Sequence, residues 1–366
     1  MKIVFIDDGI YAYASGSPSA RGGSERTQWF LSRALAAADW SVIVGVRDGM
    51  RAGERRVING IEFAGMGKNN FLLELSRFLK RERPNWIYSA GANHLLGLMV
   101  EAAKRAGVGT IFALTSDLDV ELRHATLYRP RWWPLYVWGL SRTDRIFVQH
   151  AGQLSRLLPQ WRSKASILPK VCLFGSNGDG ATTKPHLERA KYVAWVGTLM
   201  QLKRPDVLIQ IARQLPSIQF VVCGGPTRFM STPGYGEQMI SELRATANIE
   251  YLGQVAPEKA QQIIAEAAVL LCTSDVEGFP NTFVQAWSNG TPVVSLKIDP
   301  DRIIERMGVG ALSVNADRAI TDITALFDSP RRRDEIAVRA RKHIVENHSA
   351  VTVVKCFENA LGTIPQ

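Results

Sequence analysis

The residues best suited to chemistry lie in one stretch, SDVEGFPNTFVQAWSNGTPVV, which covers residues 274–294. Within it, Glu277 follows an apolar run of strand length and precedes a Gly-Phe-Pro-Asn turn, and Gln285 comes eight positions later. A carboxylate accepts charge-assisted hydrogen bonds, and its natural partners at such a position are hydroxyl groups. The stretch therefore indicates a site for a ligand that carries hydroxyls, with a purely structural turn as the alternative.

The turn after this acid opens a short helix, which the sequence predicts over residues 282–289. Pro280 supplies a preset φ and Asn281 a capping side chain. Gly290 ends the helix in the left-handed conformation, and Pro292 prevents its resumption. Unpaired N–H groups and the helix dipole favour a phosphate at such an N-terminus. A phosphate site beside a carboxylate for hydroxyls is typical of a nucleotide-sugar. The expected N–H donors are Asn281, Thr282 and Phe283.

Lys203 is a candidate cation for the same site. In VGTLMQLKRPD, Gly197 and Thr198 follow an apolar run, and Lys203 comes five residues after Thr198. A fixed cation stabilises the charge that develops on a leaving diphosphate. A solvated surface lysine is the alternative. Gly224 and Gly225 end another apolar run and allow the backbone to approach a ligand closely.

The second half of the chain resembles the retaining glycosyltransferases of GT-B architecture, in the large family four, or glycosyl transferases group 1. The similarity is carried by VAWVGTLMQLKRPDVLIQIA, FVVCGG, NIEYLGQVAPE and AEAAVLLCTSDVEGFPN. The resemblance implies that Glu277 contacts the hydroxyls of the donor hexose. It places Gln285 where the family usually has a second acid that holds the ribose. An amide can still bond two hydroxyls, as donor and as acceptor.

The resemblance also implies a pair of cations at the diphosphate, usually an arginine and then a lysine. Only Lys203 matches, because Thr198 carries no charge, and Arg204 is a candidate substitute. The backbone at Gly253 and Val255 would hold the base, although a packing turn explains these two residues equally well. The implied donor-binding set is Gly22, Gly23, Gly197, Thr198, Lys203, Gly224, Val255, Glu277, Gly278, Phe279, Pro280, Asn281, Thr282 and Gln285.

Gly22 and Gly23 lie in the first half, before Ser24, which is the predicted N-cap of an amphipathic helix. Tight glycines before a helix N-terminus favour an anion, and the family has such a loop near the donor phosphates and the acceptor. A flexible turn is the alternative. The GxGxxG fingerprint is absent, which argues against a dinucleotide cofactor.

Candidate acceptor residues also come from the first half. Many family members have a histidine after the strand that corresponds to IFAL in IFALTSDLDVEL, where this chain has Asp117 and Asp119 instead. We expect Asp117 to act in catalysis, and Asp117, Asp119, His94 and His150 to bind the acceptor. Turn or capping roles for the two acids and a surface or capping role for His94 are the alternatives.

Strand-length apolar runs alternate with helical patterns along both halves of the chain. This alternation predicts an α/β protein with parallel sheets covered on both faces. With the resemblance, it implies the GT-B architecture: two Rossmann-like, doubly wound domains that face an interdomain cleft. The expected parts are an acceptor domain over 1–172, a linker over 173–189, a donor domain over 190–345, and a C-terminal helix over 346–366. Packing of that helix back onto the first domain is one option.

The 366-residue chain carries a net charge of +10, which favours anionic partners, although no nucleic-acid-binding signature appears. Four scattered cysteines indicate buried thiols in a reducing compartment. The apolar runs are too short for a membrane span, and Asp7 and Asp8 come too early for a secretion signal. We expect a cytoplasmic protein. The stretch YRPRWWPLYVWGL, with Trp132 and Trp138, suits contact with the inner face of an anionic membrane, or else core packing.

Together these patterns predict an enzyme that moves a hexose from a nucleotide-diphosphate-sugar to an acceptor hydroxyl with retention. The acceptor would be a saccharide or lipid-linked, as in surface polysaccharide or glycolipid synthesis. We expect no cofactor and no metal requirement. Three alternatives stay open: a non-catalytic nucleotide-sugar or glycan-binding protein, a GT-B nucleotide-sugar epimerase, and an inverting transferase.

Overall fold

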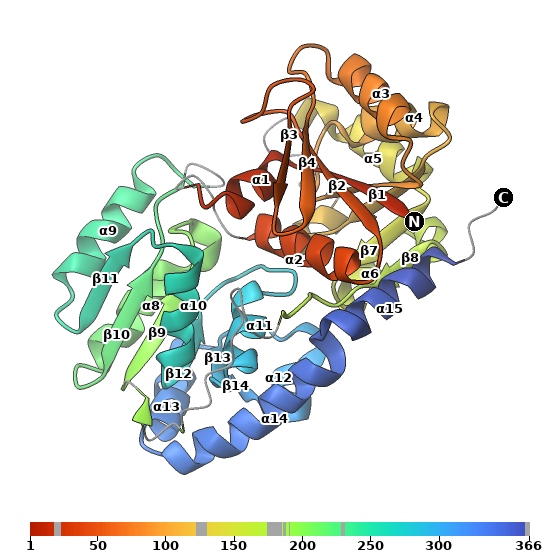
Figure 1. The fold of residues 1–366 in the computed structure, drawn as a ribbon. Helices are drawn as coiled ribbons and strands as arrows, with labels where there is room; N and C mark the ends of the chain where they lie inside the picture. Colours follow the sequence, from red (N-terminus) through yellow and green to blue (C-terminus); the bar gives the residue numbers. More distant parts are fainter. Residues whose placement is uncertain are drawn as a thin grey trace. The chain divides into compact units, whose positions relative to one another are not determined.

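The computed structural model describes residues 1–17, 23–121, 130–173, 185, 188–189, 191–227 and 231–362. The chain forms two compact units (Figure 1). Unit 1 comprises Met1–Val171 and Ala350–Gln366, and unit 2 comprises Cys172–Ser349. Each unit is built on a sheet whose strands are mainly parallel, so the predicted α/β class is confirmed. Most of the expected linker, residues 173–189, lies outside the described residues.

The sheet of unit 1 has eight strands. They are β1 (Lys2–Ile6), β2 (Ser41–Val46), β3 (Arg55–Ile58), β4 (Ile61–Gly65), β5 (Trp86–Ala90), β6 (Gly109–Ala113), β7 (Arg145–Val148) and β8 (Ala165–Ile167). Their order in space is β3-β4-β2-β1-β5-β6-β7-β8, and among these described strands only the β3–β4 pair is antiparallel. The strands β2 to β4, which follow β1 in the sequence, lie on one side of it, and the strands that follow β5 lie on the opposite side of the sheet. This strand pair is therefore the topological switch point of unit 1.

Helices of unit 1 connect and cover these strands (Figure 1). They are α1 (Asp8–Ala14), α2 (Ser24–Ala37), α3 (Phe71–Glu82), α4 (Leu96–Arg105), the 3₁₀ turns η1 (Asp117–Val120) and η2 (Pro130–Trp132), α5 (Trp133–Arg142), α6 (Ala151–Arg156), α7 (Pro159–Arg162) and α15 (Ala350–Leu361). The last helix of the chain, α15, packs against α2 and β8. Its Phe357 stacks on Phe147 with 5.2 Å between ring centroids, and Trp40 donates to Glu358 at 3.0 Å.

The sheet of unit 2 has six parallel strands. They are β9 (Tyr192–Val196), β10 (Gln219–Cys223), β11 (Ile249–Gly253), β12 (Val269–Cys272), β13 (Val293–Ser295) and β14 (Gly310–Leu312). Their order is β11-β10-β9-β12-β13-β14. The switch point of unit 2 therefore lies between β9 and β12.

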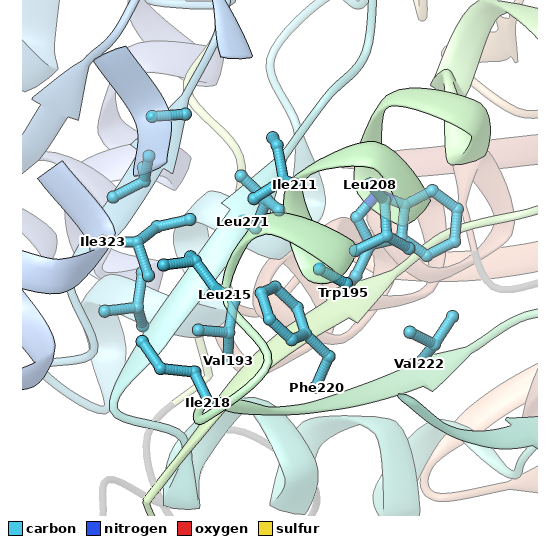
Figure 2. Close-up of a cluster of buried hydrophobic side chains, with 14 of the residues drawn as sticks. Val193, Trp195, Leu208, Ile211, Leu215, Ile218, Phe220, Val222, Leu271 and Ile323 are labelled. Atoms are coloured by element: carbon cyan, nitrogen blue, oxygen red, sulfur yellow. The ribbon is translucent and has the colours of Figure 1, made fainter. Parts of the chain in front are cut away.

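Helices cover both faces of this second sheet. They are the 3₁₀ turns η4 (Gln201–Lys203) and η5 (Pro300–Arg302), with α8 (Pro205–Gln214), α9 (Tyr235–Ala245), α10 (Pro257–Glu266), α11 (Asn281–Ser288), α12 (Ile303–Met307), α13 (Ala316–Phe327) and α14 (Pro330–His348). Alternate residues of β9 enter two different buried clusters: Val193 and Trp195 one, Ala194 the other. In Figure 2, Leu208 of α8 and Phe220 of β10 lie in the first cluster. A sheet buried on both faces explains why its strands read as continuous apolar runs.

Candidate functional site

The switch point of unit 2 collects the two stretches that the sequence singled out. Gly197 and Thr198 follow β9, and the acid-bearing turn that contains Glu277 follows β12. Because the crossovers from these two neighbouring strands leave in opposite directions, a crevice forms at their carboxyl ends, where ligands bind in open α/β sheets. The residues after β9 and β12 are therefore the first place to look for a site.

An ion pair joins these two stretches. The Nζ atom of Lys203 contacts Oε1 of Glu277, and their side chains are 27% and 15% exposed. Burial alone lowers the pKa of Lys203, but the Glu277 carboxylate outweighs burial and raises it above its ordinary value. The ammonium is therefore charged at neutral pH. Both side chains reach solvent, so the pair does not lie in a closed core.

Hydrogen bonds fix the turn that carries Lys203. Thr273 Oγ1 donates to the carbonyl of Lys203 at 2.7 Å, and Asp275 N–H donates to the carbonyl of Leu202 at 2.8 Å. The next residue, Arg204, has a φ of 53°, in the left-handed region. A residue other than glycine in that region costs about 1 to 2 kcal/mol, and such strain gathers at functional sites. The loops after β9 and β12 are thus held together as one structure.

The helix α11 begins one residue earlier than predicted, at Asn281. Pro280 is the N-cap, with an extended ψ of 130°, and Asn281 lies in the first turn instead of capping it. The N–H of Phe283 donates to the Pro280 carbonyl at 3.2 Å. The prediction that Phe283 offers an unpaired N–H is therefore wrong, because the helix closes its first turn around the proline carbonyl. Gly290 has a φ of 73°, which confirms the predicted left-handed end.

The residues between the acid and α11 are buried. The ring of Phe279 lies 5.3 Å from His348 and 6.2 Å from Trp287, between centroids. Since this ring belongs to the core of unit 2, only the backbone of Phe279 is placed to meet a ligand. Gly278 is buried beside it.

Gln285 lies one turn further along α11 and is 7% exposed. Its backbone carbonyl accepts from Ser288 Oγ at 2.9 Å and from Asn289 Nδ2 at 2.8 Å. Its side-chain amide makes no hydrogen bond to any residue that the structure describes. The amide atoms are not among the fully buried polar atoms that lack a partner in the described part of the chain, so they reach solvent and can bond a ligand hydroxyl.

The glycines after β9 and β10 lie against each other. A Cβ on Gly224 would stand 1.7 Å from the carbonyl oxygen of Gly197, so only glycine fits there. Gly224 N–H also donates to the Gly253 carbonyl at 2.8 Å. These contacts give the three residues a packing role. The Thr198 hydroxyl donates to Met200 Sδ at 3.3 Å, and Val255 is half-buried.

In unit 1, the structure brings two candidate residues together after β6 and β7. Oδ1 of Asp117 lies 2.9 Å from His150 Nε2 and 3.0 Å from Gln153 Nε2. Arg156 contacts Oδ2 of the same carboxylate. Burial raises the pKa of Asp117, but His150, Gln153 and Arg156 outweigh it and the net pKa is lowered. Sequence reasoning missed Arg156, which lies three residues beyond Gln153 on α6.

Asp119 holds its own turn together. Its Oδ2 accepts from the N–H of Thr115 at 2.6 Å and from the N–H of Ser116 at 3.1 Å, within a capping box. The carboxyl is buried, and burial raises its pKa. This is the capping role that the sequence left as the alternative. The ring of His94 lies 6.4 Å from that of Trp132, between centroids.

The glycine pair of unit 1 falls partly outside the description, because Gly22 is not among the described residues. Gly23 is the N-cap of α2, and Ser24 is the first residue of the helix. The prediction that Ser24 caps this helix is therefore wrong. No cap hydrogen bond from a side chain is present there, since glycine has none to offer.

Asp7 is a residue whose role sequence reasoning missed. It caps α1 at the end of β1, the switch strand of unit 1, where Oδ1 accepts from Gly9 N–H at 2.8 Å. Gln28 contacts Oδ2, and the other amide atom of Gln28, Oε1, is buried without a partner among the described residues. Burial raises the pKa of Asp7 to about 6. In the sequence, the signal for this capping role was the pair of aspartates that follows the first apolar run.

In the described part of the chain, no group of three or more His, Cys, Asp or Glu side chains is placed to hold a metal ion. Metal independence stays a prediction. In the same residues, no helix combines the length and hydrophobicity that crossing a bilayer requires.

Comparisons with known proteins identify relatives. The family model for glycosyl transferases group 1 matches residues 182–343. The D-inositol 3-phosphate glycosyltransferase of Mycolicibacterium gilvum is 30% identical over 332 residues, which cover 84% of this chain and 73% of the relative. The enzyme of that name from Rhodococcus opacus is 28% identical over 171 residues, or 44% of this chain and 38% of the relative.

Solved structures share the fold. Anabaena HepE in complex with UDP and glucose superposes with a TM-score of 0.75 at 14% identity, covering 99% of both chains. Sucrose-phosphate synthase from Thermosynechococcus elongatus gives 0.73 at 15% identity, covering 98% of this chain and 97% of that one. At these identities the similarity shows the architecture, which is that of GT-B glycosyltransferases.

Proposed function

The chain belongs to the glycosyl transferases group 1 family and is a glycosyltransferase, and on that premise we propose that it moves a hexose with retention from a nucleoside-diphosphate sugar to an acceptor hydroxyl. One observation carries the proposal. The Lys203–Glu277 ion pair stands at the switch point of unit 2, beside the N-terminus of α11. It offers a cation for phosphate and a carboxylate for sugar hydroxyls at the same place.

The reaction breaks the bond between the anomeric carbon and the β-phosphate oxygen, and that oxygen keeps the electron pair. The acceptor oxygen bonds to the anomeric carbon on the same face. Its proton passes to the leaving phosphate oxygen, so the products are the glycoside and the nucleoside diphosphate. Lys203 stabilises the charge that grows on the leaving diphosphate. The proposed reaction requires no metal or cofactor.

On the donor side, Glu277 orients the hexose through its hydroxyls. The unpaired amide of Gln285 takes a ribose hydroxyl. UDP is the first nucleotide to test, since HepE of the same fold was solved with UDP and glucose.

On the acceptor side, the proposed partner of the acceptor hydroxyls is the carboxylate of Asp117, which pairs with Arg156. A saccharide or lipid-linked acceptor fits surface polysaccharide or glycolipid synthesis. The relatives are named for D-inositol 3-phosphate, so that compound joins the acceptor panel. A phosphate on such an acceptor would suit Arg156.

Contact of unit 1 with an anionic membrane is part of the proposal. Trp132 and Trp138 are 49% and 40% exposed, and the Arg142 guanidinium lies 5.3 Å from the centre of the Trp138 ring. Tyr136, on the other side of α5, is fully buried. The segment of η2 and α5 thus exposes two indole rings and a guanidinium, the combination found in membrane-surface helices.

The test is a transfer assay with UDP-sugars and the acceptor panel, with the product analysed by proton NMR. Transfer with an unchanged anomeric configuration supports the proposal, and an inverted product overturns retention. Lys203→Met should abolish most transfer, whereas the control Lys342→Met, on the surface of α14, should not. Binding of donor without transfer or hydrolysis would favour the non-catalytic alternative, and a changed free nucleotide-sugar would favour the epimerase.

A further inference from the structure

A second acid–cation group adjoins the Lys203–Glu277 pair. Asp275 lies two residues before Glu277, and its Oδ1 accepts from Lys297 Nζ at 2.5 Å. Its Oδ2 lies 3.3 Å from Arg204 Nη1. Lys297 comes from the loop after β13, the strand next to β12. Three separate loops therefore contribute charge to the same end of the sheet.

The register of the sheet explains how Lys297 reaches this place. Cys272 pairs with Ser295 where β12 and β13 end. Asp275 and Lys297 follow these two partners by three and two residues, so they leave the sheet side by side. The position of Lys297 is thus set by strand pairing. Sequence reasoning did not single it out.

The three cations differ in how firmly they are held. Arg204 bonds Asp206 through Nε and Nη2, at 2.9 to 3.2 Å, as well as Asp275, and these acids raise its pKa although burial opposes them. Lys203 is paired with Glu277 and largely covered. Among the residues that the structure describes, Lys297 contacts a single carboxylate, and its side chain is 54% exposed. Of the three, Lys297 is the one that can reorient on its flexible stem without disturbing other contacts.

The charges of this group balance when no ligand is present. The three cations face three carboxylates, those of Asp206, Asp275 and Glu277. A diphosphate adds two or more negative charges, and the charge at the leaving oxygen grows as the sugar bond breaks. One ammonium at Lys203 leaves much of this charge uncompensated. A second, movable ammonium within reach would compensate it in the transition state.

We propose that Lys297 is a diphosphate-binding residue, whose ammonium group leaves Asp275 and binds the phosphate oxygens of the donor. This inference rests on the proposed function, because it assumes that a nucleoside diphosphate binds beside Lys203. In the free protein, Asp275 pairs with the Lys297 ammonium and holds it near the site. The same ion pair forms again when the diphosphate leaves.

The experiment measures binding of UDP and of uridine by calorimetry to the full-length protein, with GDP or ADP and their nucleosides in place of UDP if one of those binds instead. Lys297→Ala should weaken UDP roughly tenfold, the order expected for a lost charge-assisted hydrogen bond, and leave uridine unchanged. The dependence of UDP affinity on salt should also become shallower. Lys297→Arg should keep most of the affinity.

The control is Lys342→Ala. Lys342 is an exposed lysine of unit 2 that is also paired with one acid, Glu346, at 3.8 Å, and its replacement should leave UDP binding unchanged. Equal UDP affinity of the Lys297→Ala and wild-type proteins overturns the inference while the proposed function stands. Failure of the wild-type protein to bind any of the nucleoside diphosphates overturns the proposed function itself. An equal loss of uridine affinity in Lys297→Ala would show a structural role for Lys297 and also overturn the inference.

Discussion

Lys203 and Glu277 are 74 residues apart in the chain, yet their side chains form an ion pair where β9 and β12 end. Each is the nearest counter-charge of the other, so each is held in place before any ligand arrives. In the proposed reaction they serve different parts of the donor, the ammonium its diphosphate and the carboxylate its hexose. The pair thus prepares the site in advance, which lowers the ordering cost of binding.

Replacing Glu277 tests the centre of this arrangement. Glu277→Gln should lower kcat/KM at least a hundredfold, because a neutral amide cannot hold the hexose with charge-assisted bonds, an effect of about 3 kcal/mol. The measurement is steady-state transfer with the donor that the wild-type protein uses. As a control, Glu335→Gln on the exposed side of α14 should behave like the wild type. Normal transfer by Glu277→Gln would contradict the assigned role.

Gln285 can be tested with a modified nucleotide. Gln285→Ala should weaken UDP binding about tenfold, since the ligand loses a hydrogen bond to a buried amide. The same variant should bind 2′,3′-dideoxy-UDP as the wild-type protein does, because that nucleotide has no ribose hydroxyl to lose. Calorimetry gives both affinities. Equal losses for both nucleotides would show that Gln285 does not contact the ribose.

Gly224 tests the packing after β9 and β10. Gly224→Ala places a methyl group against the Gly197 carbonyl at a φ of 150°, so the unfolding free energy should fall by more than about 2 kcal/mol. The control is Gly234→Ala in the same unit, where φ is 82° and nothing lies within 4 Å. Its unfolding free energy should fall by only about 1 kcal/mol, the cost of placing an alanine in the left-handed region. Denaturant unfolding measures both, and similar losses would contradict the steric argument.

The raised pKa of Asp7 predicts that the stability of the protein depends on pH. Its folded pKa, about 6, is raised above the unfolded value of 3.8, so folding favours the neutral form. The resulting penalty is absent well below pH 3.8, grows as pH rises from there to 6, and reaches about 3 kcal/mol at most above it. Asp7→Asn removes the charge, and its amide can donate to the unpaired Oε1 of Gln28.

The unfolding free energy of Asp7→Asn should therefore exceed that of the wild type at pH 7.5, and most of the excess should be lost at pH 4. A constant difference between Asp7→Asn and the wild type across this pH range would contradict the titration of Asp7.

The exposed indoles of unit 1 predict lipid binding. The double variant Trp132→Ala and Trp138→Ala should lose most co-sedimentation with phosphatidylglycerol vesicles, because each indole contributes apolar area at the interface. Leu158→Ala, another exposed apolar side chain of unit 1, should bind like the wild type. Vesicles of phosphatidylcholine alone should bind little of any variant, since the cations need anionic headgroups. Unchanged sedimentation of the double variant would contradict membrane contact through α5.

Local patterns predicted the alternation of strands and helices and the residue that ends α11. Gly290 was predicted to end α11 because a glycine followed two residues later by proline cannot continue a helix, and its φ of 73° confirms it. The start of α11 was misjudged. Whether Asn281 or Pro280 caps the helix depends on one ψ angle, which the neighbouring loop sets.

For the candidate site too, local patterns predicted some features and missed others. The sequence by itself determined that Glu277 and Lys203 follow apolar strands and that Gln285 lies on the next helix, because periodicity and turn chemistry act over a few residues. Only the tertiary structure decided that Lys203 pairs with Glu277, that Lys297 reaches Asp275, and that burial raises the pKa of Asp7. Those facts depend on which strands are neighbours and on what covers each side chain, and contacts between residues far apart in the chain leave no local pattern.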